Sequence, residues 1–236
     1  MFTEFLLLSQ ILSNDSFSIN QYQYKQSETV VNLYSQQKSQ KSQENFRDML
    51  EALGERETGF TSGDSRQYNF VNPQLYFLGK YQFAEVLLIR LGYYKATSYF
   101  GNGAKKNYWR GTWMGKNGIN SKAEFINSPE VQEKAIREAF GVYWQDINYL
   151  MNKRGKSIDS YLSQVKTFNE SGKPKTIKIT LSGIIAAAHL KGPDKVVDLL
   201  VSGKVSQDPF GTSILAYLEE FGGYETTPKD FLLSQD

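Results

Sequence analysis

The sequence lacks cysteine, and it has only one histidine among its 236 residues. Without cysteine there can be no disulfide, no thiolate nucleophile and no metal site built on thiolates. One histidine, His189, excludes a metal site with several histidine ligands. Ser-His-Asp chemistry would depend on that same residue. The sequence therefore predicts neither a metal ion nor a cofactor.

Long hydrophobic runs and concentrated charge are also missing. No stretch approaches the roughly 20 apolar residues that a membrane-spanning helix needs, so we do not expect an integral membrane protein. The short apolar run at residues 5–8 follows Glu4 and has no basic residue before it, unlike a secretory signal. The 27 basic and 25 acidic side chains are dispersed, which argues against a nucleic-acid partner.

The composition divides the chain in two. Residues 1–45 are rich in polar side chains and include a low-complexity stretch of Gln, Ser and Lys at residues 36–43. Such a segment buries too little surface to offset its ordering entropy, so we predict an arm or linker that could bind an assembly partner. Residues 46–236 are long enough for one domain with its own core.

A helix is predicted at the start of this domain. Its apolar residues recur with the spacing of one helix face: Phe46, Met49, Leu50 and Leu53. The pattern ends near Arg56, which places Glu57 at or just past the end of the helix. Residues 58–64 are typical of a turn.

The remaining pattern predicts a mainly α domain with minimal β structure. The pair Ser128-Pro129 is a strong helix start, and Gly92 is typical of a helix end. A long region rich in glycine and aromatic residues, 93–127, has no helical period and is expected to be an ordered loop. The other expected elements are helices at 83–91, 129–154, 181–190, 193–200 and 213–221, and a short strand at 176–180.

Three separated segments carry a resemblance to a known family. They are residues 56–59 (Arg-Glu-Thr-Gly), residues 79–83 (Gly-Lys-Tyr-Gln-Phe) and residues 187–193 (Ala-Ala-His-Leu-Lys-Gly-Pro). In order and spacing they resemble the lysozyme-like superfamily, particularly the soluble lytic transglycosylases and goose-type lysozymes. The family has a Glu-Ser pair, a Gly-Leu-Met-Gln segment and an Ala-Tyr-Asn-Ala-Gly-Pro segment at these places.

This resemblance implies an α+β lysozyme-like fold and a peptidoglycan-cleaving activity. Glu57 would be the general acid/base at the β-1,4 bond between N-acetylmuramic acid and N-acetylglucosamine. The partner would be the glycan strands of the bacterial cell wall, in the periplasm or outside the cell, reached by a non-classical export route. The chain differs from the family at Thr58 (Ser), Lys80-Tyr81 (Leu-Met) and His189-Leu190 (Tyr-Asn).

The chemistry of glycoside cleavage agrees with a role for Glu57. The reaction needs a carboxylic acid that is still protonated when it meets the leaving oxygen. The negative end of a helix dipole and an apolar neighbour such as Phe60 both disfavour the charged carboxylate. The alternatives are a solvated Glu57 paired with Arg56, and Glu55 as the acid.

A second carboxylate is the usual nucleophile or base of a glycosidase, and Asp64 is the candidate in this sequence. An Asp in a turn more often binds its own backbone. Lytic transglycosylases are understood to need no second carboxylate, because the acetamido group of the substrate assists and its 6-hydroxyl closes a 1,6-anhydro ring. Water and the intramolecular hydroxyl both stay open as acceptors.

Five further residues are candidates for substrate binding. Tyr81 and Gln82 could hydrogen-bond sugar hydroxyls or the N-acetyl group, and His189 could replace the missing tyrosine as a donor. Trp109 and Trp113 could form a platform for a sugar ring. For each of these residues, core packing or a structural hydrogen bond is the competing interpretation.

Two other functions remain compatible with the sequence. One is a non-catalytic glycan-binding or structural module of a secretion or phage assembly, which would bind glycan but release no soluble fragments. The other is a chitinase-like hydrolase, which would cleave chitin oligomers that lack peptide stems.

Overall fold

The computed structural model describes residues 45–98 and 106–232. The described residues belong to one compact unit, Glu44–Asp236, nearly all of which is described. The arm predicted at residues 1–45 lies outside the described residues except for Asn45. Within the described ranges, no helix has the length and apolar content needed to cross a membrane.

The described residues are mainly helical, as predicted, with two small hairpins. The α-helices are α2 (Phe46–Thr58), α3 (Arg66–Asn69), α4 (Glu85–Arg90), α5 (Lys122–Ile126), α6 (Pro129–Lys153), α7 (Leu181–Lys191), α8 (Pro193–Ser202) and α9 (Ile214–Glu220). The antiparallel hairpins pair β1 (Tyr94–Ala96) with β2 (Gly111–Trp113), and β3 (Val165–Glu170) with β4 (Lys173–Lys178). In register, Tyr94 faces Trp113 and Val165 faces Lys178.

The region expected to be one long loop contains more structure than predicted. Residues 93–127 include β1, β2 and α5, because strands of three residues are too short to leave a period in the sequence. The strand expected at 176–180 is β4, which begins earlier at Lys173. Its partner β3 was missed, since only one of its six residues, Phe168, is buried and no regular alternation marks the strand.

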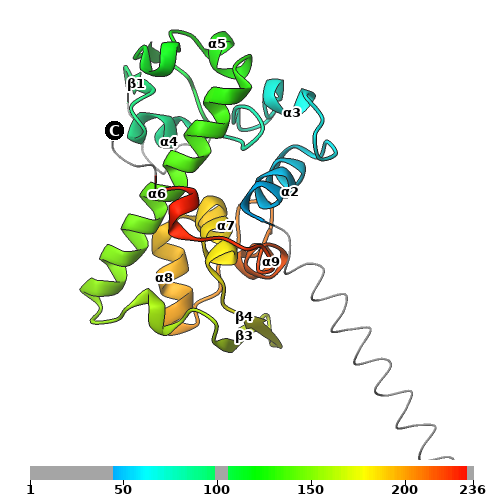
Figure 1. Cartoon of the computed structure of the whole chain (residues 1–236), viewed down its shortest axis with the longest axis vertical. Helices are drawn as coiled ribbons and strands as arrows, with labels where there is room; N and C mark the ends of the chain where they lie inside the picture. Colours follow the sequence, from blue (N-terminus) through cyan, green and yellow to red (C-terminus); the bar gives the residue numbers. More distant parts are fainter. Residues whose placement is uncertain (1–44, 99–105, 233–236) are drawn as a thin grey trace, which may run out of the picture. The chain divides into compact units, whose positions relative to one another are not determined.

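Helix α7 forms the centre of the described unit. It contacts α2, α6, α8 and α9, and Figure 1 shows it enclosed among them. Residues 182–188 of this helix are all buried, as expected for a helix that is apolar on every side. At Gly183 a Cβ would lie 2.5 Å from the carbonyl oxygen of Leu218, so the glycine allows α9 to approach closely.

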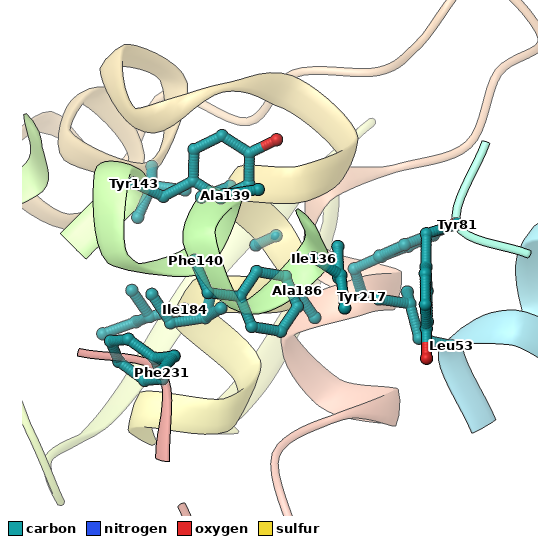
Figure 2. Packing of buried hydrophobic residues seen from close by; sticks show 14 of the residues in the cluster. Leu53, Tyr81, Ile136, Ala139, Phe140, Tyr143, Ile184, Ala186, Tyr217 and Phe231 are labelled. Atoms are coloured by element: carbon teal, nitrogen blue, oxygen red, sulfur yellow. The ribbon is translucent and has the colours of Figure 1, made fainter. Parts of the chain in front are cut away.

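The core around α7 joins residues distant in sequence. Figure 2 shows Phe140 of α6 against Ile184 of α7, with Tyr217 of α9 near Tyr81 and Leu53. All five of these side chains are buried. This packing brings the end of α2, the segment before α4 and the middle of α9 to one place, where a cleft opens.

Candidate active site

Glu57 lies in the last turn of α2, at the wall of a cleft. The helix ends at Thr58, and Gly59 caps it with φ of 74°, a left-handed conformation that favours glycine. The cleft has a volume of about 1140 Å³, slightly above the roughly 300–1,000 Å³ of typical small-ligand pockets. The Glu57 side chain is 16% exposed, so its carboxyl group reaches the cleft while most of the side chain is covered.

Tyr217 from α9 holds one oxygen of this carboxyl group. Its hydroxyl donates a hydrogen bond of 2.7 Å to Oε1 of Glu57. Burial and the neighbouring carboxylate of Glu57 raise the pKa of Tyr217, so it remains a neutral donor. Within the described residues no hydrogen bond reaches Oε2, which is therefore the oxygen available to carry an acidic proton.

His189 lies next to Glu57, but its ring N–H group already donates a hydrogen bond to another residue. Its Nε2 is 2.9 Å from the carbonyl oxygen of Tyr81 and 4.0 Å from Oε1 of Glu57. Because a carbonyl oxygen only accepts, Nε2 carries the hydrogen and donates it to Tyr81. The other ring nitrogen, Nδ1, is buried and has no partner among the described residues. His189 thus lines the cleft without a free donor for the substrate.

Gln82 presents an unpartnered acceptor beside the cleft. Its Nε2 donates to the carbonyl oxygen of Gly79 at 2.7 Å, which fixes the orientation of the amide. Its Oε1 is buried and has no donor in the described part of the chain. A buried acceptor without a donor costs about 1–3 kcal/mol. The φ of Gln82 is 47°, an uncommon value for a residue with a side chain.

Three of the five predicted substrate-binding residues do not line the cleft. Tyr81 is fully buried, and its hydroxyl donates to Glu133 at 2.6 Å, so only its backbone carbonyl serves the site. Trp109 and Trp113 line a separate, smaller pocket and not the cleft.

Asp64, proposed from the sequence as a second catalytic carboxylate, is not brought to Glu57. It is not among the described residues that line the cleft. Its two oxygens accept hydrogen bonds of 2.6 to 3.1 Å from the guanidinium group of Arg66. The side chain of Asp64 therefore completes the turn after α2, which was the competing interpretation.

Other carboxylates do line the cleft, but each is engaged. Glu85 accepts from the backbone amides of Tyr108 and Trp109. The remaining three bind basic side chains or loop amides: Asp146 to Arg90, Asp194 to Lys195, and Asp208 to the amides of Phe210 and Thr212. Of these four, only Asp146 has both oxygens bound, while Glu85, Asp194 and Asp208 each keep one oxygen without a hydrogen bond to a described residue, as Glu57 does.

Comparisons with family models, with curated proteins and with solved structures find no match to this chain. The site is therefore assessed on its own geometry. In the described residues no cluster of three or more His, Asp or Glu side chains could hold a metal ion.

A buried ion network supports the segment that carries Gln82. The side chain of Lys80 is 1% exposed, and its Nζ lies 2.6 Å from Glu51 and 3.0 Å from Glu133. Burial alone would lower the pKa of Lys80, but the hydrogen bond to Glu51 and the charge of Glu133 raise it overall. The charged ammonium group of Lys80 therefore connects α2 and α6 to residues 79–82.

Tyr217 and Lys80 are the residues that the sequence did not identify. Tyr217 is 160 positions from Glu57, and its apolar helix gives no sign that its hydroxyl meets a carboxylate. Lys80 was noted only as a departure from the family segment. A buried lysine cannot be distinguished from an exposed one until its acidic partners are placed.

Proposed function

We propose that this chain cleaves the glycan strands of peptidoglycan, with Glu57 as general acid and base. The observation that carries the proposal is the Glu57 carboxyl group at the wall of a cleft of about 1140 Å³, with Oε1 held by Tyr217 and Oε2 open. The resemblance of three sequence segments to lytic transglycosylases and goose-type lysozymes supports the choice of substrate.

The chemistry proceeds in two proton transfers. Glu57 donates its proton from Oε2 to the glycosidic oxygen as the C–O bond breaks and an oxocarbenium-like state develops. The resulting carboxylate is stabilised by the hydroxyl of Tyr217. Glu57 then takes a proton from the acceptor, either water or the 6-hydroxyl of the sugar, as the new bond forms at the anomeric carbon.

The other cleft carboxylates already form hydrogen bonds or ion pairs within the protein, which favours a mechanism with one acid. An ordinary retaining or inverting enzyme needs a second free carboxylate at about 5 to 9.5 Å. Arg90 binds both oxygens of Asp146, and Glu85, Asp194 and Asp208 are each held at one oxygen, so we favour assistance by the acetamido group of the substrate. Either acceptor can then complete the reaction: the 6-hydroxyl gives a 1,6-anhydro product, and water gives a reducing-end product.

Digestion of purified peptidoglycan by the full chain, followed by mass spectrometry, tests this proposal. We expect soluble muropeptides, and a mass lower by one water distinguishes 1,6-anhydro ends from the reducing ends that hydrolysis leaves. Retention of the chain on peptidoglycan without soluble fragments would instead indicate the binding-module alternative. Faster cleavage of chitin oligomers than of peptidoglycan would favour the chitinase-like alternative.

A further inference from the structure

A second pocket, of about 390 Å³, is lined by cations and aromatic rings. The cations are Lys106, Arg110 and Lys122, and the rings include those of Tyr76, Trp109 and Trp113. The volume lies within the roughly 300–1,000 Å³ of small-ligand pockets. Of these six residues only Lys106 also lines the cleft of Glu57, so the pocket is a candidate site of its own.

The lining of this pocket carries positive charge that the described part of the chain does not neutralise. All three cations are exposed, and no acidic side chain is among the described lining residues. None of the three forms an ion pair with a described residue. In the cleft, by contrast, Arg90 and Lys195 are both paired with aspartates. The pocket therefore attracts an anionic ligand.

Two of the rings stand on strained backbone. Tyr76 and Trp109 have φ values of 57° and 53°, in the left-handed region that bulky residues rarely adopt. A hydrogen bond of 2.7 Å from the indole nitrogen of Trp109 to the carbonyl oxygen of Tyr76 joins the two residues. Glu85 fixes the second of them by accepting from the amide of Trp109 at 3.2 Å. Backbone of this kind clusters at ligand-binding sites, so the strain supports a binding role for the pocket.

The rings and cations together favour a ligand ring that bears an anionic group. The indoles of Trp109 and Trp113 are stacked with centroids 5.9 Å apart and planes at 14°, and both are only half-buried. Lys106 lies over the ring of Tyr76, 5.1 Å from its centroid. A flat apolar face next to a cation suits a ring whose substituent is a carboxylate or a phosphate.

The polar lining favours a sugar ring over a nucleobase. Nucleobases are recognised by hydrogen bonds to the donors and acceptors on their edges. Asn107 is the amide side chain among the described lining residues, and it is already held. Its oxygen accepts from the backbone amide of Glu85 at 2.6 Å, and its nitrogen donates to the carbonyl oxygen of Leu75 at 2.7 Å. The described pocket therefore reads charge and ring shape, which an acidic sugar supplies.

We propose that this pocket binds a hexuronate unit of an acidic polysaccharide, as a binding site separate from the cleft. The carboxyl group of a hexuronate is a substituent of the pyranose ring itself and is ionised at neutral pH. Arg110 offers two parallel donors to this carboxylate, and the ring packs on the indole of Trp109. The inference goes beyond the proposed function and does not depend on it, because the pocket holds the chain on a polymer that Glu57 does not cleave.

Calorimetric titration of the full chain tests this inference with ligands that separate charge from ring. The ligands are tetragalacturonate, its methyl ester with the same rings and no charge, and an acrylate tetramer with carboxylates and no ring. Three exposed ion pairs predict about tenfold tighter binding of tetragalacturonate than of its methyl ester, a preference that falls with added salt. The acrylate tetramer should bind more weakly than tetragalacturonate, because it has no ring to pack on the indoles.

Paired variants locate the preference for the acid over its ester. Arg110→Gln combined with Lys122→Gln should abolish it, since both cations line the pocket. Lys153→Gln combined with Lys156→Gln is the matched control, because it removes the same charge from exposed cations that line neither the pocket nor the cleft. Circular dichroism verifies that each variant folds.

Four results would overturn the inference. The first is equal affinity of the parent for tetragalacturonate and its methyl ester. The second is a preference that survives in the Arg110 and Lys122 double variant, and the third is its loss in the control. The fourth is tighter binding of the acrylate tetramer, or of adenosine monophosphate, than of tetragalacturonate, which would assign the pocket to simple polyanions or to nucleotides.

Discussion

The two oxygens of the Glu57 carboxyl group have different surroundings. Oε1 accepts from the hydroxyl of Tyr217, and the ring of His189 stands 4.0 Å away with its Nε2 hydrogen committed to Tyr81. This leaves Oε2 to exchange a proton with the substrate. The hydrogen bond from Tyr217 both orients the acid and stabilises the carboxylate left after proton donation.

Substitution of Tyr217 by Phe tests this arrangement. A hydrogen bond to a charged group is worth about 1.5–3 kcal/mol, so Tyr217→Phe should lower the cleavage rate by about tenfold or more. The fold should survive, since Phe preserves the buried ring. The rate of soluble fragment release from peptidoglycan is the measurement.

Tyr149→Phe is the control for this prediction, because Tyr149 lies on α6 with 59% of its surface exposed and does not line the cleft. Its rate should equal that of the parent. An unchanged rate in Tyr217→Phe would mean that the hydrogen bond to Glu57 has no part in the reaction.

At the scale of elements, the site depends on a buried cation that joins helices. Lys80 connects Glu51 of α2 with Glu133 of α6, and both carboxylates are partly exposed. Removing one partner of a buried ion pair leaves the others uncompensated, so Lys80→Met should lower the free energy of unfolding by about 3 kcal/mol at neutral pH. Urea denaturation at equilibrium measures this loss.

The loss should depend on pH. Burial would raise the pKa of Glu51, but the hydrogen bond and charge of Lys80 outweigh it and lower the pKa below 4.5. A lowered pKa stabilises the fold above pH 4.5, and that contribution disappears as the pH falls through the lowered value. Because the pKa of Lys80 is raised, the stabilisation that its charge gives the fold is lost only above pH 10.5. The difference in the free energy of unfolding between the parent and Lys80→Met should therefore shrink below pH 4.5. A difference that stays constant down to pH 3 would contradict the role of the ion network.

Long periodic elements were predictable from the sequence, and short or distant ones were not. The helix spacing from Phe46, the Ser128-Pro129 start and the Gly192-Pro193 break each gave an element close to its observed bounds. The hairpin of β1 and β2 is too short to leave a pattern. The contact between Glu57 and Tyr217 depends on how α9 packs on α7, which no local pattern encodes.

At the scale of the whole chain, the residues of the site all belong to one compact unit, Glu44–Asp236. Removal of residues 1–43 should therefore leave the rate of cleavage of purified peptidoglycan unchanged, as measured beside the full chain at equal concentration. Residue 44 is kept so that Asn45 can cap α2 through its hydrogen bonds to the amides of Arg47 and Asp48. A large fall in rate, with circular dichroism unchanged, would show that residues 1–43 take part in the reaction.

The most direct test of the central claim compares two acids that lie two residues apart near the end of α2. Glu57 lines the cleft, whereas Glu55 is exposed, does not line it and accepts from the amide of Ser62. Loss of a general acid typically costs roughly 10²–10⁴-fold in rate. We predict that Glu57→Gln loses peptidoglycan cleavage by that factor while Glu55→Gln cleaves like the parent. Equal cleavage by Glu57→Gln and the parent would contradict the account.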